Sequence, residues 1–134
     1  MKTYVSVIDD DKDISTLFKA FLTGYWRVNV VSFFIDPIIG SKHFADNKKC
    51  YALVISDLRM PNLNGLELLK RVKDKNPKVR TVLISAFEVE SDPIFKQYIQ
   101  DGIIDNFMKK PIRINSFCSE VSDQMHDFRK TANM

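Results

Sequence analysis

Charged and hydroxyl-bearing residues stand at the ends of four short apolar segments of the chain. They are Asp9–Asp11, Asp57, Ser85 and the pair Lys109–Lys110. Carboxylates that lie close together repel one another, and each raises the pKa of the others unless a cation compensates. Two cations suit this set of residues, a lysine ammonium and a divalent metal. The hard oxygen ligands favour Mg²⁺, which commonly bridges carboxylates to phosphate.

The same residue types are those needed for phosphoryl transfer to a carboxylate. An aspartate beside a bound metal can attack a phosphoryl donor and form an acyl phosphate. The metal, an ammonium group and a hydroxyl group can then neutralise charge on the transferring oxygens. We therefore expect phosphoryl chemistry if the fold brings Asp57 together with the N-terminal aspartates, Ser85 and a lysine.

The apolar segments alternate with helical patterns along the whole chain. Five strands are predicted, at Thr3–Ile8, Val28–Phe33, Tyr51–Ser56, Thr81–Ser85 and Asn106–Met108. Apolar residues at helical spacing predict three helices, over Ile14–Leu22, Leu66–Val72 and Ile114–Phe128. Two further helix starts are indicated by an aspartate before a proline, at Asp36-Pro37 and Asp92-Pro93.

This order of five strands and five helices predicts an α/β fold. The strands mostly lack in/out alternation, as expected for strands covered on both faces. Alternating strands and helices form a mostly parallel sheet with helices on both sides. Open sheets of this kind bind ligands beyond the carboxyl ends of their strands. Those ends are where the charged and hydroxyl-bearing residues stand.

Length and composition exclude several other classes of protein. The chain has 134 residues, of which 45% are hydrophobic and 28% charged, as in a single globular domain. Its net charge of +3 is small and its lysines are dispersed, so nucleic-acid binding is not expected. No apolar run approaches the roughly 20 residues of a membrane span, and no signal peptide is visible, so a cytoplasmic location is predicted. Cys50 and Cys118 are too few for a disulfide framework and are expected to be free, partly buried thiols.

Four motifs at the strand ends resemble those of one protein family. They are Val7–Asp11, Ser56–Gly65, Ile84–Ala86 and Phe107–Pro111. In this order they make the chain similar, over nearly its whole length, to the receiver domains of two-component response regulators. The resemblance implies a flavodoxin-like, doubly wound, five-stranded parallel sheet in the order 2-1-3-4-5, with five helices in a three-layer α/β/α arrangement. It also implies a receiver domain over residues 1–130, followed by a short polar tail at 131–134.

The resemblance assigns the acidic residues to a phosphoryl group and a metal. Asp57 matches the phosphoacceptor, which is also a metal ligand, and Asp10 matches a direct Mg²⁺ ligand. Asp9 matches a residue that acts mainly through a metal-bound water, and the backbone carbonyl of Arg59 matches the third protein ligand. Taken without the motifs, Asp57 would be interpreted as an ordinary aspartate at a turn.

Other matched positions are implied to respond to the phosphoryl group. Ser85 matches the hydroxyl that bonds a phosphoryl oxygen, and Lys110, rather than Lys109, matches the ammonium that contacts it. Phe107 falls where the family has an aromatic residue that turns inward when Ser85 moves. The resemblance also implies that two variable positions, Arg59 and Phe87, influence how fast the acyl phosphate hydrolyses.

The function implied is a phosphorylation switch rather than an enzyme. Asp57 is expected to take its phosphoryl group from a sensor histidine kinase or a histidine phosphotransfer protein in a Mg²⁺-dependent reaction. A face formed by the fourth helix, fifth strand and fifth helix is then expected to bind a downstream target protein. The domain is expected to be a monomer or a phosphorylation-dependent dimer that binds neither nucleic acid nor membrane.

Three alternatives stay open at the level of the sequence. The first is a degenerate receiver that never carries phosphate and serves as a phosphorylation-independent interaction module. The second is a flavodoxin-like binder of a nucleotide or flavin, although three aspartates after the first strand would repel its phosphate. The third is a metal-dependent aspartyl-phosphate hydrolase, a class that usually places its nucleophilic aspartate after the first strand and carries a cap insertion.

Overall fold

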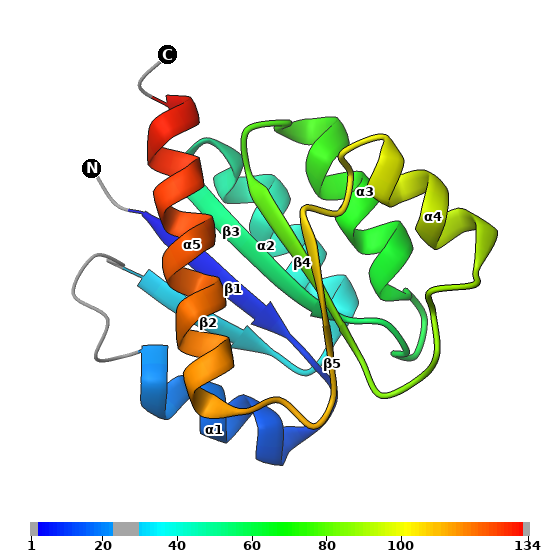
Figure 1. The fold of residues 1–134 in the computed structure, drawn as a ribbon. Helices are drawn as coiled ribbons and strands as arrows, with labels where there is room; N and C mark the ends of the chain where they lie inside the picture. The colour runs from blue at the N-terminus through cyan, green and yellow to red at the C-terminus, as the bar shows by residue number, and fades with distance from the viewer. Residues whose placement is uncertain (1–2, 23–29, 133–134) are drawn as a thin grey trace.

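The computed structural model describes residues 3–22 and 30–132. Five strands form one parallel sheet in the order β2-β1-β3-β4-β5 (Figure 1). They are β1 (Tyr4–Ile8), β2 (Val30–Phe34), β3 (Tyr51–Asp57), β4 (Arg80–Ser85) and β5 (Asn106–Lys109). The strand order is the one predicted, and each strand overlaps the segment predicted for it. The first two residues of the predicted second strand, Val28 and Asn29, lie outside the described residues.

Helices connect the strands and cover both faces of the sheet. They are α1 (Lys12–Leu22), α2 (Pro37–Asn47), α3 (Gly65–Lys75), α4 (Pro93–Gln100) and α5 (Ile114–Ala132). A short 3₁₀ turn, η1 (Lys48–Cys50), leads from α2 into β3. Figure 1 shows α1 and α5 on one face and α2, α3 and α4 on the other, which confirms the flavodoxin-like three-layer arrangement. Among the described helices, none is long and apolar enough to cross a membrane.

Two separate apolar cores lie on the two faces of the sheet. On the face covered by α1 and α5, Phe18 stacks on Phe117 with ring centroids 4.0 Å apart. On the other face, Leu69 of α3 and Phe95 of α4 belong to a second cluster. All seven residues of β3 are buried, because this strand lies in the middle of the sheet between the two helical layers.

The two helix starts predicted from aspartate–proline pairs are confirmed. At the start of α2, the Asp36 carboxylate accepts a hydrogen bond from the Ile38 N–H at 2.9 Å. At the start of α4, the Asp92 carboxylate accepts hydrogen bonds from the N–H groups of Ile94 at 2.8 Å and Phe95 at 3.2 Å. Each carboxylate satisfies donors that the first turn of a helix leaves without a backbone partner.

Helix α5 differs from expectation in its length and in one exposed residue. It continues to Ala132, so the first two residues of the predicted tail at 131–134 are helical. The prediction of a partly buried thiol is wrong for Cys118, which is exposed. Cys118 lies one residue beyond the buried Phe117 and is therefore turned away from the sheet. Cys50 is half-buried, and both thiols are free.

A polar network fastens α3 and α5 to the sheet at the N-terminal ends of β4 and β5. Arg80 Nε donates to Oε1 of Gln124 in α5 at 2.8 Å, and Gln124 is only 4% exposed. Asp105, just before β5, lies 2.7 Å from Lys73 Nζ of α3 through its Oδ2. The same Oδ2 accepts a hydrogen bond from the Thr81 N–H at 2.9 Å. These contacts hold the helices against the sheet at the end opposite to the carboxyl ends of the strands.

Candidate functional site

The carboxyl ends of four neighbouring strands bring the predicted site residues to one edge of the sheet. Asp9 follows β1, Asp57 and Ser85 are the last residues of β3 and β4, and Lys110 follows β5. Carboxylate oxygens of Asp9, Asp10 and Asp57 lie within 4.8 Å of one another. Asp9 and Asp57 are buried, whereas Asp10 is exposed. The structure therefore gathers the three predicted acidic residues into one cluster.

Lys110 supplies a cation to the buried carboxylates. Its Nζ lies 2.9 Å from Asp9 Oδ2 and 3.3 Å from Asp57 Oδ1. The peptide bond that follows Lys110 is cis. Lys109, in contrast, turns outward and forms an exposed ion pair with Glu88. The geometry thus distinguishes the two adjacent lysines and places Lys110 at the acidic cluster.

Burial disfavours the charged forms of the two inner carboxylates. Burial, together with the charge of Asp9, raises the pKa of Asp57 to about 6, although Lys110 opposes the shift. Burial also raises the pKa of Asp9, against Lys110 and against the Asp11 N–H that bonds Asp9 Oδ1 at 2.9 Å. Burial alone would lower the pKa of Lys110, but its contacts with the two carboxylates outweigh burial and the pKa is raised. The cluster contains three carboxylates, and a single lysine ammonium lies against it.

This excess of carboxylates fits a divalent cation. Asp9 Oδ2 is buried, and apart from the Lys110 ammonium 2.9 Å away it has no polar partner within the described residues. The side-chain donors of the cluster are all carboxylate oxygens, the type that Mg²⁺ prefers. The exposed Asp10 opens the cluster to solvent, which suits an ion that keeps several of its waters. The residues present therefore fit a magnesium ion.

Ser85 reaches the same edge, but its hydroxyl is bound by the loop that follows β4. Ser85 Oγ accepts a hydrogen bond from the Phe87 N–H at 2.9 Å and donates one to the Phe87 carbonyl at 3.2 Å. Because its proton is directed at Phe87, the hydroxyl cannot donate to a group on Asp57 in this arrangement. Phe107 is half-buried, and its ring meets Phe95 edge-on with centroids 5.3 Å apart. Its inward turn stays a prediction.

Two contacts at the loop after β4 were not predicted from the sequence. The guanidinium carbon of Arg59 lies 3.8 Å from the centroid of the Phe87 ring, a cation–π contact. Glu88, the next residue, pairs with Lys109. The sequence indicates the Arg59–Phe87 contact only indirectly. Each of the two residues lies two positions beyond a site residue, at the ends of adjacent strands.

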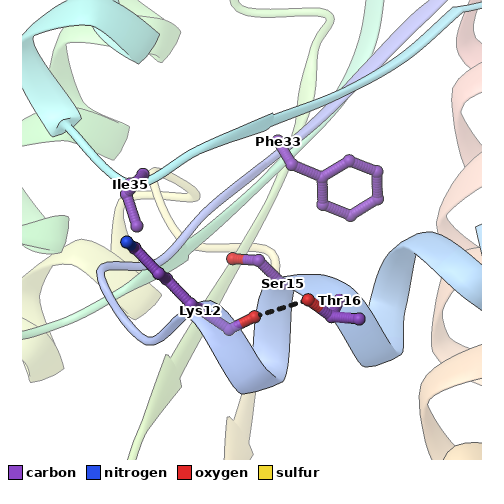
Figure 2. Close-up of a pocket in the computed structure, with 5 residues that line it drawn as sticks. All are labelled: Lys12, Ser15, Thr16, Phe33 and Ile35. Carbon is purple, nitrogen blue, oxygen red and sulfur yellow. Dashed lines mark hydrogen bonds between the residues drawn. The ribbon is translucent and has the colours of Figure 1, made fainter.

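A cavity of about 260 Å³ lies between α1 and the end of β2. It is lined by Lys12, Ser15, Thr16, Phe33 and Ile35 (Figure 2). Figure 2 shows the Lys12 side chain extending toward Ile35. Ser15 Oγ donates to the Asp9 carbonyl at 3.4 Å, and Thr16 Oγ1 donates to the Lys12 carbonyl at 2.9 Å. Because backbone groups occupy both hydroxyls, the cavity contributes Lys12 and an apolar wall rather than a second set of reactive groups.

Gly65 allows α3 to begin directly against Asp57. A Cβ here would lie 2.2 Å from the Asp57 carbonyl oxygen, and the Gly65 N–H donates to the Leu58 carbonyl at 2.8 Å. We expect Gly65→Ala to lower the free energy of unfolding by about 2–3 kcal/mol, because the clash is with backbone atoms. Urea denaturation measures this change. The control is Glu67→Ala, an exposed position in the same helical turn. It should lower the free energy of unfolding by less than about 1 kcal/mol. Equal losses of this free energy in the two variants would contradict the argument.

The sequence matches the response regulator receiver domain family over residues 5–122. It is 30% identical over 123 residues to the transcriptional regulatory protein MalR of Bacillus subtilis, an alignment that covers 89% of this chain and 48% of that protein. It is 29% identical over 107 residues to a protein-glutamate methylesterase/protein-glutamine glutaminase of Thermotoga maritima, covering 80% of this chain and 30% of that protein. The chain therefore spans about half or less of the length of these curated relatives.

Solved structures share the fold over almost the whole chain. A response regulator receiver domain protein from Clostridium thermocellum has a TM-score of 0.82 at 21% identity, covering 98% of this chain and 99% of that one. A CheY-like response regulator receiver domain protein from Methanospirillum hungatei has a TM-score of 0.82 at 17% identity, with the same coverage of 98% and 99%. Identities this low support the fold alone. The sequence match, however, runs from the first strand into the last helix, and the chain therefore belongs to the response regulator receiver domain family.

Proposed function

We propose that this chain accepts a phosphoryl group on Asp57 within a two-component system. A sensor histidine kinase or a histidine phosphotransfer protein is the proposed donor. The observation that carries the proposal is the cluster of Asp57 with Asp9, Asp10 and Lys110, in which Lys110 Nζ lies 3.3 Å from Asp57 Oδ1. This arrangement combines a carboxylate nucleophile, further acidic ligands and a cation at one edge of the sheet.

Magnesium is the proposed cofactor. The side chains of Asp10 and Asp57 and the backbone carbonyl of Arg59 would hold it directly, and Asp9 would hold it through a water. When bound, it balances the negative charge of the cluster and neutralises charge on phosphoryl oxygens. Support comes from the three clustered carboxylates, two of them buried, which a single lysine does not balance.

The residues of the chain carry out the transfer itself. An oxygen of the Asp57 carboxylate forms a bond to phosphorus while the bond from phosphorus to the donor's histidine nitrogen breaks. Lys110 favours the deprotonated Asp57 that this attack requires, and its ammonium then neutralises charge on the phosphoryl oxygens. Ser85 is proposed to leave the Phe87 backbone and to donate its hydroxyl proton to one of those oxygens.

The proposed output is binding rather than catalytic turnover. Ser85 ends β4 and Lys110 follows β5, so a change at either residue reaches the loops that lead into α4 and α5. These helices carry three exposed isoleucines that suit contact with a protein partner: Ile94, Ile99 and Ile114. Phosphorylation is proposed to shift the face of α4, β5 and α5 toward a state that binds a downstream target. The domain would act as a monomer or a phosphorylation-dependent dimer in the cytoplasm, the usual compartment of receiver domains.

Intact-mass measurement after incubation with acetyl phosphate and Mg²⁺ tests the proposal. We expect the wild type to gain the mass of one phosphoryl group, and Asp57→Asn or wild type in EDTA to gain none. Asp46→Asn, an exposed position in α2, is the matched control and should be phosphorylated like the wild type. A wild type without an adduct would favour the alternative, a degenerate receiver that acts as a phosphorylation-independent interaction module.

A further inference from the structure

The loop that follows β4 keeps the Ser85 hydroxyl turned toward itself. The hydroxyl accepts the Phe87 N–H at 2.9 Å and donates to the Phe87 carbonyl at 3.2 Å, so a single residue engages it on both sides. Ser85 is fully buried, so the hydroxyl has no solvent to replace these two partners. To donate to a group on Asp57, it must first break its bond to the Phe87 carbonyl.

Phe87 and Glu88 are each held by a side chain from a neighbouring strand end. Arg59, from the loop after β3, places its guanidinium 3.8 Å from the centroid of the Phe87 ring. Lys109, the last residue of β5, forms an ion pair with Glu88. Strands β3 and β5 flank β4 in the sheet, so the start of this loop is held from both sides.

We propose that the side chains of Arg59 and Lys109 form a latch that keeps Ser85 turned away from Asp57. Turning Ser85 toward Asp57 takes the hydroxyl away from the Phe87 N–H and carbonyl, and the two contacts hold residues 87 and 88 where these backbone groups bind it. The contacts therefore stabilise the phosphoryl-free arrangement and weaken the affinity of the site for a phosphoryl group. The Arg59 and Lys109 side chains act here as positioning groups, through the Phe87 ring and Glu88. The inference rests on the proposed function, since it concerns regulation of the same site.

The latch consists of two weak contacts rather than one strong contact. The side chains of Lys109 and Glu88 are 50% and 75% exposed, and Phe87 is 46% exposed. Exposed ion pairs and exposed cation–π contacts are each worth little. Breaking either contact should therefore change the affinity of the site by about twofold to fivefold, and breaking both independent contacts by about fourfold to twenty-fivefold.

Calorimetric titration tests the latch. It measures the affinity of the full chain for beryllofluoride in the presence of Mg²⁺. Phe87→Leu removes the aromatic ring and keeps apolar bulk, and Glu88→Gln removes the ion pair and keeps the shape. We expect both variants to bind beryllofluoride more tightly than the wild type, and the double variant most tightly. Lys70→Ala, which breaks an exposed ion pair with Asp74 in α3, is the control and should bind like the wild type.

Repeating the titrations in a Ser85→Ala background separates the latch from a general loosening of the loop. Without a hydroxyl to release, Phe87→Leu and Glu88→Gln should no longer tighten binding. Two results overturn the latch. In the first, Phe87→Leu and Glu88→Gln bind beryllofluoride no more tightly than the wild type. In the second, they tighten binding equally in the wild-type and Ser85→Ala backgrounds. A wild type that does not bind beryllofluoride at all overturns the proposed function instead, so the two failures are distinguishable.

Discussion

Replacing Lys110 with methionine is expected to lower the free energy of unfolding of the metal-free protein by about 2–4 kcal/mol near pH 8. The Lys110 side chain is 14% exposed and that of Asp9 is fully buried. The variant would therefore leave buried carboxylates without the ammonium that now lies 2.9 Å from Asp9 and 3.3 Å from Asp57. Methionine retains much of the aliphatic part of the side chain, so the loss reports mainly on the missing charge.

The destabilisation by Lys110→Met should shrink as the pH falls. Without the ammonium, the pKa values of Asp9 and Asp57, already raised by burial, rise further in the folded protein. A carboxyl group whose pKa is higher in the folded than in the unfolded state destabilises the fold at high pH, and this effect vanishes below both values. The variant and the wild type should therefore differ most near pH 8 and least near pH 4.

Urea denaturation in EDTA across about pH 4–8 measures this difference. Lys109→Met is the matched control, because Lys109 is adjacent in sequence and its ion pair with Glu88 is exposed. The control should lower the free energy of unfolding by less than about 1 kcal/mol at every pH. If Lys110→Met lowers the free energy of unfolding no more than the control does, or by the same amount at every pH, Lys110 does not compensate the buried carboxylates.

Replacing Asp57 with asparagine should make the metal-free protein more stable, by about 1–3 kcal/mol near pH 8. Burial and the charge of Asp9 raise the pKa of Asp57 from 3.8 to about 6, and one unit of pKa corresponds to about 1.4 kcal/mol. The charged carboxylate is thus disfavoured by folding, and an asparagine of similar shape carries no such charge. For a domain of this size, the melting temperature should rise by about 4–11 °C.

The direction of the pH dependence follows from the raised pKa of Asp57. Between about pH 6 and pH 4, the folded wild type binds a proton that the unfolded chain does not bind, so the wild type gains stability as the pH falls. Asp57→Asn lacks this group, while the remaining carboxylates titrate in both proteins. The gap between the two melting temperatures should therefore close toward pH 4.

Scanning calorimetry of both proteins in EDTA at several pH values tests this prediction. Added Mg²⁺ should narrow the gap at neutral pH, because an ion that prefers the folded wild type stabilises it by mass action. A gap that is independent of pH, or a wild type more stable than Asp57→Asn near pH 8 without metal, would contradict the argument.

The positions of the site residues could be predicted because they depend on topology rather than on packing detail. Asp9, Asp57 and Lys110 each stand just after or at the end of a parallel strand, and such ends meet at one edge of a sheet. The strands themselves were visible as apolar runs. The preference for Lys110 over Lys109 needed the family motif, because spacing alone treats two adjacent lysines alike.

The orientation of side chains around the site could not be predicted in the same way. Ser85 turns toward Phe87 because of the path of the loop after β4, and local sequence does not dictate that path. The Arg80–Gln124 contact joins residues 44 positions apart, so it depends on how α5 packs on β4. Gln124 even falls on the apolar stripe of α5, yet nothing in its residue type indicates burial or names its partner.

The two apolar cores have a consequence for how such a domain can diversify. Within the described residues, the two clusters share no buried side chain, since the sheet separates them. Substitutions in one core, as at Leu69, should add in energy to those in the other, as at Val121. Phe95 of α4 belongs to one core and Val121 of α5 to the other. Substitutions can therefore remodel the packing of one of these helices while the packing of the other stays unchanged.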